Sequence, residues 1–520
     1  MRCAWARAVA LGASLALLAA CNGDDGAPVA SPTYYQTKTP YRPQQDAQTY
    51  EPPPAGYTAV FTQLVARHGS RGLANMKSDL VVYNMWERAS ADGALTELGA
   101  QLGPDVLKIM RANFLLGCGV PGIDHFGYGN ETQTGISEHM QLADRMLARH
   151  GDLLRAPRRI VVVSSGVDRA VDSANFFVAA LVAARPELNA LLLRPPAPAG
   201  YPAGNPKMHP DGTNRFLLYF HNLGPATDLV TNPADPYYKT YQASLAYQAY
   251  SKDPDLLAKE DAITRDPAAQ TQGRALLERL FAKSFVDRID SAQLTFSDTG
   301  TKHFTSDDGK CTNTLTGDGK ATIKSSADAG SYLYDLYGVA PAMTSEAGVD
   351  FTPYFPAEQA LYFASQRDAF DFYEKGPSIT EKGDVTHRMA QILQDDFFNE
   401  VDAVARGDLT HAAKLRFTHA EIVIPFAAKM ELPGASRQLP RAMLYDYGNN
   451  PWRGDLVSPM AANMQWDVYR NAAGTILVRM LYNEKESDFK AACDAAKIAP
   501  ASRYYDYQKL KACYGHIAAN

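Results

Sequence analysis

Histidine and arginine occur together in the stretch VFTQLVARHGSRGL, which covers residues 60 to 73. His68 stands between Arg67 and Arg71, and the stretch contains no carboxylate. Guanidinium groups stay charged at any working pH and match the geometry of phosphate oxygens. A histidine among such cations stays neutral and nucleophilic more easily, because the cations disfavour its protonated form. These residue types therefore predict an anion site at which the histidine can attack.

Two further strand-like runs end in polar residues of the same kinds. RRIVVVSS precedes Arg169, and AKLRFT precedes His419 and Glu421. Ligands of open α/β sheets bind outside the carboxyl ends of the strands, so we expect these side chains to meet His68 there. A covalent phosphohistidine would divide phosphate transfer into two steps, and a protonated Glu421 would give its proton to the departing alcohol oxygen.

Each of these residues alone has a more ordinary explanation. A lone histidine is usually a packing or surface residue, a lone arginine is usually a solvated charge, and an H-x-E triplet is a weak signal. The R-H-G-x-R string at a strand end is more specific, because a glycine at position 69 would let the backbone approach a ligand closely.

The elements that must position these residues alternate between strand and helix. YTAVFTQLVA has the composition of a strand, whereas Ile136, Met140, Ala143 and Leu147 form the apolar stripe of a helix. RRIVVVSS is an unbroken run of the kind found in strands buried on both faces. This order predicts an α/β sheet with helices on both faces. Residues 195 to 405 are predicted as a mostly helical insertion, within which 298 to 322 are expected to be a loop.

The N-terminus has the features of an export signal. Residues 1 to 20 combine Arg2 and Arg7 with a short apolar run, and LAAC ends this segment at Cys21. A small-residue site that ends in cysteine is similar to the bacterial lipobox, in which the cysteine is lipidated. We therefore expect a lipoprotein exported from a bacterial cell and anchored at the outer membrane or periplasmic face, whose only membrane attachment is this lipid. The alternative is an ordinary signal peptide with a chance cysteine.

Charge and cysteine content exclude several classes of protein. Removing residues 1 to 20 takes the formal net charge from −6 to −8, which disfavours general nucleic-acid binding and requires any anion site to be a local positive pocket. No CxxC pair occurs, so no metal site or cofactor is predicted. Four cysteines after Cys21 in an oxidising compartment predict two disulfides. We favour Cys493 with Cys513, because they flank one short segment; Cys118 with Cys311 follows only by remainder.

Several motifs resemble one known family. RHGSR is similar to the signature of the histidine phosphatase superfamily, in its acid phosphatase and phytase branch, and most like the multiple inositol-polyphosphate phosphatases. The segments TKTPY at residues 37 to 41 and SSGVDRAVDSANFF also resemble this family, as do FTHAE at residues 417 to 421, SPMAANMQWDVYR and ILVRMLYNEK. The resemblance covers about residues 33 to 490, although the family commonly has proline where Leu73 stands.

The resemblance implies a fold and a division of the chain. The fold would be a phosphoglycerate-mutase-like central mixed sheet flanked by helices, with an inserted, mostly helical domain. Residues 1 to 20 would be the signal peptide and 21 to 32 a tether. Residues 33 to 194 and 406 to 520 would form the core, and 195 to 405 would form the domain that determines substrate specificity.

The resemblance also assigns roles. His68 would be the nucleophile and Glu421 the proton donor, and the phosphate would be held by Arg67, Arg71, Arg169 and His419. The expected activity is metal-independent hydrolysis of phytate, which is inositol hexakisphosphate, and of lower inositol phosphates. Two alternatives stay open: a broad acid phosphatase that prefers sugar phosphates, and a surface lipoprotein that binds phosphorylated ligands without turnover. Lys38 and Lys375 would contact further phosphates or be solvated surface residues.

Overall fold

The structure is a computed structural model, and it describes residues 33–196 and 211–517. The predicted signal peptide, the lipidation site Cys21 and the tether at 21 to 32 lie outside the described residues. From Thr33 onward the chain forms one compact unit. Within the described ranges, no helix is long and apolar enough to cross a membrane.

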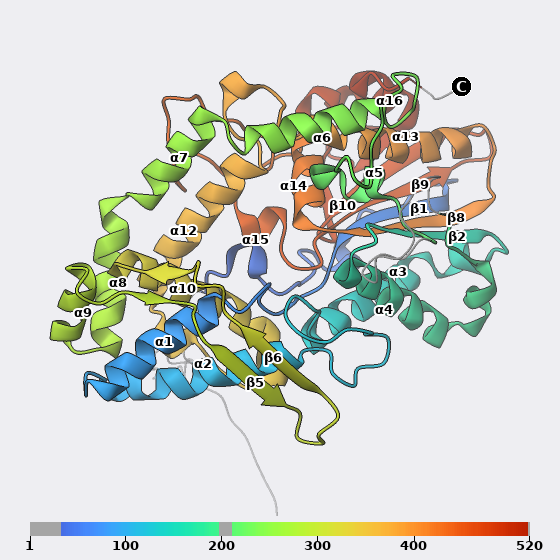
Figure 1. Ribbon diagram of the computed structural model, residues 1–520. Helices are drawn as coiled ribbons and strands as arrows, with labels where there is room; N and C mark the ends of the chain where they lie inside the picture. Colours follow the sequence, from blue (N-terminus) through green and yellow to red (C-terminus); the bar gives the residue numbers. More distant parts are fainter. Residues whose placement is uncertain (1–32, 197–210, 518–520) are drawn as a thin grey trace, which may run out of the picture. The chain divides into compact units, whose positions relative to one another are not determined.

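A mixed sheet has the strand order β11-β10-β9-β1-β8-β2-β3, with β12 paired to β10, and its long strands lie among helices on the right of Figure 1. Neighbouring strands among β1, β8, β2 and β3 pair in parallel, whereas β9 to β12 pair antiparallel. The predicted central mixed sheet is thus confirmed. The strands are β1 (Thr58–Arg67), β2 (Arg159–Ser164), β3 (Leu192–Leu193), β8 (His411–Thr418), β9 (Asn463–Arg470), β10 (Ile476–Tyr482), β11 (Lys485–Ser487) and β12 (Tyr504–Asp506).

Helices cover both faces of the sheet, as the continuous apolar strands require. On β1, Leu64 and Ala66 pack in one cluster, whereas Val65 packs in another, so successive side chains point to opposite faces. The first face is covered by α3 (Gln133–Arg155) and α4 (Asp168–Ala184). The second face is covered by α5 (Arg215–Leu218), α6 (Tyr238–Tyr250), α13 (Gln391–Ala405), α14 (Ala420–Lys429) and α16 (Tyr507–Tyr514).

A separate apolar cluster joins helices from two stretches of the chain. These helices are α1 (Ser78–Ala91), α2 (Glu97–Leu115), α8 (Pro267–Leu280), α9 (Lys283–Asp290), α10 (Ser326–Val339) and the first half of α12 (Ala357–Glu374). The second half of α12 packs with the sheet cluster instead, so α12 connects the two cores. The predicted domain boundaries at 194 and 405 stay a prediction.

The segment 298 to 322 was predicted to be a loop, and this prediction is wrong. β5 (Thr301–Thr305) and β6 (Thr312–Thr316) form an antiparallel hairpin, and β4 (Phe296–Ser297) pairs with β7 (Thr322–Ile323). Abundant Asp, Gly and Lys made the segment look irregular, but threonine recurs at alternate positions and favours strands. Phe304 packs edge-to-face on Phe114 of α2, with the ring centroids 4.9 Å apart, and fixes one side of the hairpin.

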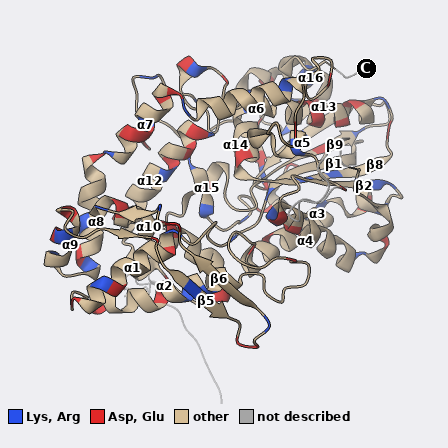
Figure 2. Ribbon diagram, in the orientation of Figure 1, with Lys and Arg blue, Asp and Glu red and all other residues tan. Residues whose placement is uncertain are grey.

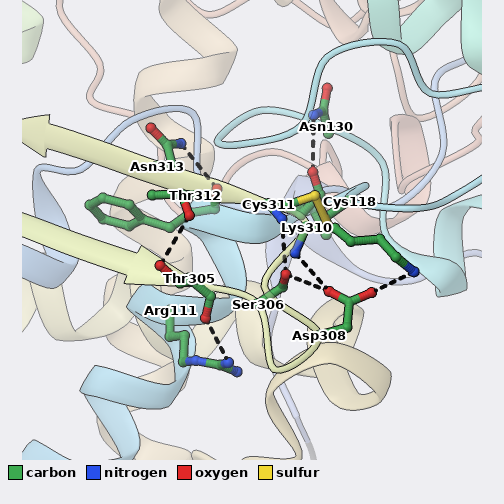
Figure 3. Close-up of a disulfide and its surroundings, with 12 residues drawn as sticks. Arg111, Cys118, Asn130, Thr305, Ser306, Asp308, Lys310, Cys311, Thr312 and Asn313 are labelled. Carbon is green, nitrogen blue, oxygen red and sulfur yellow. Dashed lines mark hydrogen bonds and ion pairs between the residues drawn. A yellow bond between two sulfur atoms is a disulfide. The ribbon is translucent and has the colours of Figure 1, made fainter.

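Both predicted disulfides are present. Cys493 pairs with Cys513 and Cys118 with Cys311. The second bond ties the loop after α2 to the tip of the β5–β6 hairpin (Figure 3). Arg111 of α2 donates to the carbonyl of Thr305 at 3.1 Å beside it, so the hairpin tip is held at two points.

Candidate active site

The carboxyl ends of three parallel strands bring the predicted residues together. Arg67 at the end of β1 pairs in register with Thr418 of β8, and Phe417 pairs with Ser164 of β2. His68 and His419 follow these ends directly, and their ring centroids lie 5.6 Å apart. The structure therefore places the three motifs at one edge of the sheet, as the sequence predicted.

A cavity of about 440 Å³ opens at this edge. Its walls come from the strand ends, from α10 and α12, and from the N-terminal segment before β1. Basic and acidic positions are interspersed on the helices (Figure 2), and four arginines line this one cavity. The lining residues are Gln36, Thr37, Lys38, Arg67, His68, Arg71, Arg169, Tyr334, Asp335, Arg367, Phe370, Asp371, Glu374, Lys375, Ala420 and Glu421.

The hydrogen bond of His68 defines its reactive atom. Its Nδ1 lies 2.9 Å from the carbonyl oxygen of Gly69. A carbonyl can only accept, so Nδ1 carries the proton and Nε2 keeps its lone pair. Burial, followed by the charges of Arg169 and Arg67, holds the pKa of His68 well below its usual value. The histidine therefore stays neutral down to acidic pH and keeps the lone pair on Nε2.

Three guanidinium groups around His68 each keep one nitrogen without a partner. The Nε atoms of Arg67, Arg71 and Arg169 are buried, and none has a hydrogen-bond partner among the described residues. Arg67 is oriented by its Nη1, which donates to the carbonyl of Thr37 at 2.6 Å. Burial lowers the pKa of Arg67 to about 10 and that of Arg71 to about 9, so both stay charged at neutral pH. Unpaired charged donors of this kind beside a cavity suit an anion.

His419 also has a buried ring nitrogen without a partner among the described residues. Its Nε2 lies 2.8 Å from the hydroxyl oxygen of Ser165, while its Nδ1 is buried and has no described partner. Burial and Arg169 hold the pKa of His419 well below its usual value, so the ring is neutral. If the Ser165 hydroxyl donates to Nε2, Nδ1 carries the proton and can donate to a phosphate oxygen.

Arg169 and Glu421 lie in the first turns of two helices that begin at the cavity. Arg169 is the second residue of α4, and Glu421 is the second residue of α14. Neither helix has a side-chain hydrogen bond from its N-cap residue. The positive ends of both helix dipoles therefore add to the attraction for an anion.

Glu421 is held in an ionic group. Lys375 Nζ lies 2.9 Å from Asp371 and 3.7 Å from Glu421. Burial alone would raise the pKa of Glu421, but Lys375 and the neighbouring histidines hold it well below its usual value. Lys375 and Lys38 both line the cavity, and Lys38 pairs with Asp335 at 3.3 Å. Both lysines are thus in ion pairs within the cavity wall.

Two glutamates and a histidine hold the loop that carries His68 from behind. Glu131 accepts from the amide of Gly69 at 2.7 Å, and Glu138 of α3 accepts from the amide of Ser70 at 2.7 Å. The ring of His139 lies 3.1 Å from the carbonyl of Arg67, and burial lowers its pKa to about 3, so the neutral ring donates to that carbonyl.

Gly69 of the motif allows a different close contact from the one predicted. A Cβ at Gly69 would lie 2.5 Å from the carbonyl oxygen of Gly135, in the first turn of α3. A Cβ at Gly135 would in turn lie 2.1 Å from the carbonyl oxygen of Ser70. The two glycines therefore let α3 pack directly behind the loop, and Gly69 does not make room for a ligand.

Sequence reasoning missed several residues of the site. His221 lies in a short helix, with its ring centroid 6.4 Å from that of His419, and no local motif marks it. Arg367 and Asp371 of α12 carry a readable signal, because with Lys375, the C-cap residue of this helix, they form a charged stripe at four-residue spacing. Such a stripe is usually solvated, and only the fold turns it toward the cavity.

Comparison with solved structures identifies relatives of the whole chain. The apo form of the Bifidobacterium longum multiple inositol polyphosphate phosphatase has a TM-score of 0.80 and 32% sequence identity, over 93% of this chain and 97% of that chain. Its complex with inositol hexasulfate has a TM-score of 0.77 over the same shares at the same identity. The phytase from D. castellii shares the fold, with a TM-score of 0.56 and 14% identity over 92% of this chain and 84% of that chain. No protein-family model and no curated protein matched.

The sheet and its cluster of histidines and arginines define a histidine phosphatase of the acid phosphatase and phytase branch. Identity of 32% over nearly the full length of both chains is more specific than the shared fold. The chain belongs to the multiple inositol polyphosphate phosphatase family.

Proposed function

We propose that this protein is an enzyme that hydrolyses phytate and lower inositol polyphosphates through a phosphohistidine intermediate, without a metal ion. The observation that carries the proposal is the set of buried nitrogen atoms without partners around Nε2 of His68. Such donors suit the oxygens of a phosphoryl group, whose transfer depends on positioning and on neutralising charge. The Bifidobacterium longum relative bound to inositol hexasulfate supports a highly charged inositol ring as the ligand.

In the first step, Nε2 of His68 attacks phosphorus in line with the bond to the ring oxygen. The new bond joins nitrogen to phosphorus, and the bond between phosphorus and the ring oxygen breaks. Arg67, Arg71, Arg169 and Nδ1 of His419 donate to the non-bridging oxygens. Glu421 gives its proton to the departing ring oxygen, which leaves as a hydroxyl group.

In the second step, water attacks phosphorus, and the nitrogen–phosphorus bond breaks. The ionised Glu421 takes the proton of the attacking water, and inorganic phosphate leaves. This step needs the carboxylate, which is the form that Lys375 favours in the substrate-free site. The first step needs the acid, so the negative charge of the arriving phosphate must raise the pKa of Glu421.

Two rival functions predict different outcomes. A broad acid phosphatase would prefer sugar phosphates over phytate, and a binding protein would release no phosphate from either. The presence of both a neutral His68 nucleophile and the nearby Glu421 favours an enzyme, because binding alone requires neither group.

The test is phosphate release from phytate and from glucose 6-phosphate by the purified protein, with EDTA present. We expect higher kcat/KM on phytate and no loss with EDTA. A preference for glucose 6-phosphate would establish the broad phosphatase, and strong inhibition by EDTA would refute the metal-independent mechanism.

Two disulfides indicate an exported protein. We infer that lipidation of Cys21 anchors it at the outer membrane or periplasmic face. Cys21→Ser should then release the protein from the membrane fraction of the bacterium, and unchanged partitioning would refute the anchor.

A further inference from the structure

Glu131 connects two parts of the site that come from different elements. Its Oε1 accepts the amide hydrogen of Gly69, the residue after His68, at 2.7 Å. The same oxygen accepts from the hydroxyl of Ser173. Ser173 lies one turn after Arg169 on α4, and its hydroxyl oxygen is 3.2 Å from the amide nitrogen of Gly69. One buried oxygen atom thus contacts both the loop of His68 and the helix of Arg169.

Glu138, which also holds the loop, differs from Glu131 in how its two oxygens are paired. Glu138 accepts from the amide of Ser70, from its hydroxyl and from the amide of Tyr41, so both of its oxygens are satisfied. In Glu131, by contrast, Oε2 is buried and has no described partner, although the residue is only 1% exposed. Burial raises the pKa of the Glu131 carboxyl group well above its usual value, so the neutral form is favoured. Its buried oxygen accepts from both Gly69 and Ser173, and an apolar side chain could not make these two contacts.

Glu131 also lines a second cavity, of about 600 Å³. This cavity shares no lining residue with the cavity of His68, and its wall includes Glu346 and the disulfide of Cys118 and Cys311. The side chain of Glu131 thus separates the nucleophile loop from an open space large enough to admit a small molecule. Removal of this side chain would leave a binding place for a free carboxylate.

We propose that Glu131 is a positioning residue. It fixes the position of the His68 loop relative to the Arg169 helix, so that both contact the same phosphate. The inference rests on the proposed function, in which His68 attacks the phosphate that Arg169 binds. Without this carboxylate, Gly69 and α4 keep only their weaker contact through Ser173. A displacement of about 1 Å in such a geometry costs on the order of 100-fold in rate.

The experiment compares Glu131→Ala, Glu131→Gln and Glu346→Ala on phytate and on p-nitrophenyl phosphate. We expect Glu131→Ala to lower kcat about 100-fold on both substrates, with a much smaller change in KM. Glu131→Gln keeps an acceptor oxygen and should retain most of kcat. Glu346→Ala is the matched control: Glu346 lines the same cavity, but its carboxylate accepts from Gln133 at 2.7 Å and not from the loop. It should act like the wild type.

Chemical rescue separates positioning from folding. Formate fits the space that Glu131→Ala opens beside the second cavity, so it should restore kcat of this variant at least about tenfold and leave the wild type unchanged. If Glu131→Ala does not fold, Ser173→Ala decides, with an expected loss of about tenfold in kcat. Wild-type kcat in Glu131→Ala or, failing that variant, in Ser173→Ala would overturn the inference, as would the absence of rescue. An inactive wild type would instead refute the proposed function.

Discussion

The two ends of the active-site cavity differ in whether their charged groups are already paired. At the end that we propose binds the phosphate, the Nε atoms of Arg67, Arg71 and Arg169 are buried and have no partner among the described residues. At the end that we propose protonates the leaving group, Glu421 and Lys375 are already in an ionic group with Asp371. The phosphate end therefore has its donors in place before an anion arrives. At the leaving-group end, Lys375 already balances the charge of Glu421, so Glu421 must take up a proton when substrate binds. Substitutions at the two ends should therefore reduce activity in different ways.

The sharpest test of the phosphate end is His68→Ala, which removes the nucleophile and leaves the cations. We expect kcat on phytate to fall by a factor on the order of 10⁴ or more, because no other group can form the covalent intermediate. Phosphate should still bind, as measured by calorimetry. Substantial remaining turnover would mean that water attacks the ester directly.

Arg169→Lys tests whether geometry or charge matters at the same end. The variant keeps the positive charge but loses the planar fork, so we expect kcat/KM to fall roughly 100-fold to 1,000-fold. Inhibition by inorganic phosphate should weaken in parallel. A loss below about threefold would show that charge alone suffices there.

Glu421→Gln moves the test to the leaving-group end, where the expected effect depends on the substrate. Loss of the general acid should slow phytate hydrolysis about 100-fold, because an inositol alkoxide leaves poorly. An activated aryl phosphate, such as p-nitrophenyl phosphate, should lose less than about threefold in its first step. Burst kinetics would separate the first step from the second, in which Glu421 also acts. Equal losses on both substrates in the first step would contradict the proton-donor role.

Lys375→Met should have the smallest effect on rate and the clearest effect on pH dependence. Lys375 holds the pKa of Glu421 low, and burial raises it once this cation is gone. The acid form is required in the first step, so activity is lost as the pH rises through this pKa. Raising the pKa should therefore move the alkaline limb of kcat to higher pH. The measurement is the pH profile on phytate, with Lys310→Met as a control because Lys310 lies on the exposed hairpin turn.

The phosphate end could be predicted from the sequence because its residues follow strands directly. Arg67, His68, Arg169 and His419 each stand within five residues of a strand end, and parallel strands place their ends at one edge. The local sequence pattern therefore predicted which residues lie close together in the fold. The same reasoning found Glu421, which follows His419 by two positions.

Apart from Glu421, the leaving-group end and the back of the loop could not be predicted in this way. Asp371 and Lys375 reach the cavity through the long-range packing of α12, and Glu131 reaches Gly69 across a separation of 62 residues. Each looks like an ordinary surface charge in the sequence. The prediction of a loop at 298 to 322 was wrong for a related reason, because the strands of this segment are fixed by contact with α2.

The disulfide pattern has a consequence for biogenesis. Cys118 pairs with Cys311 and Cys493 with Cys513, so on the proposed export route the four thiols of the described chain join in the order in which translocation would deliver them. An oxidase that links each new thiol to the preceding free one yields the native pattern directly. Maturation should thus proceed without a disulfide isomerase, provided that Cys21 is withdrawn from the pool, as acylation would ensure.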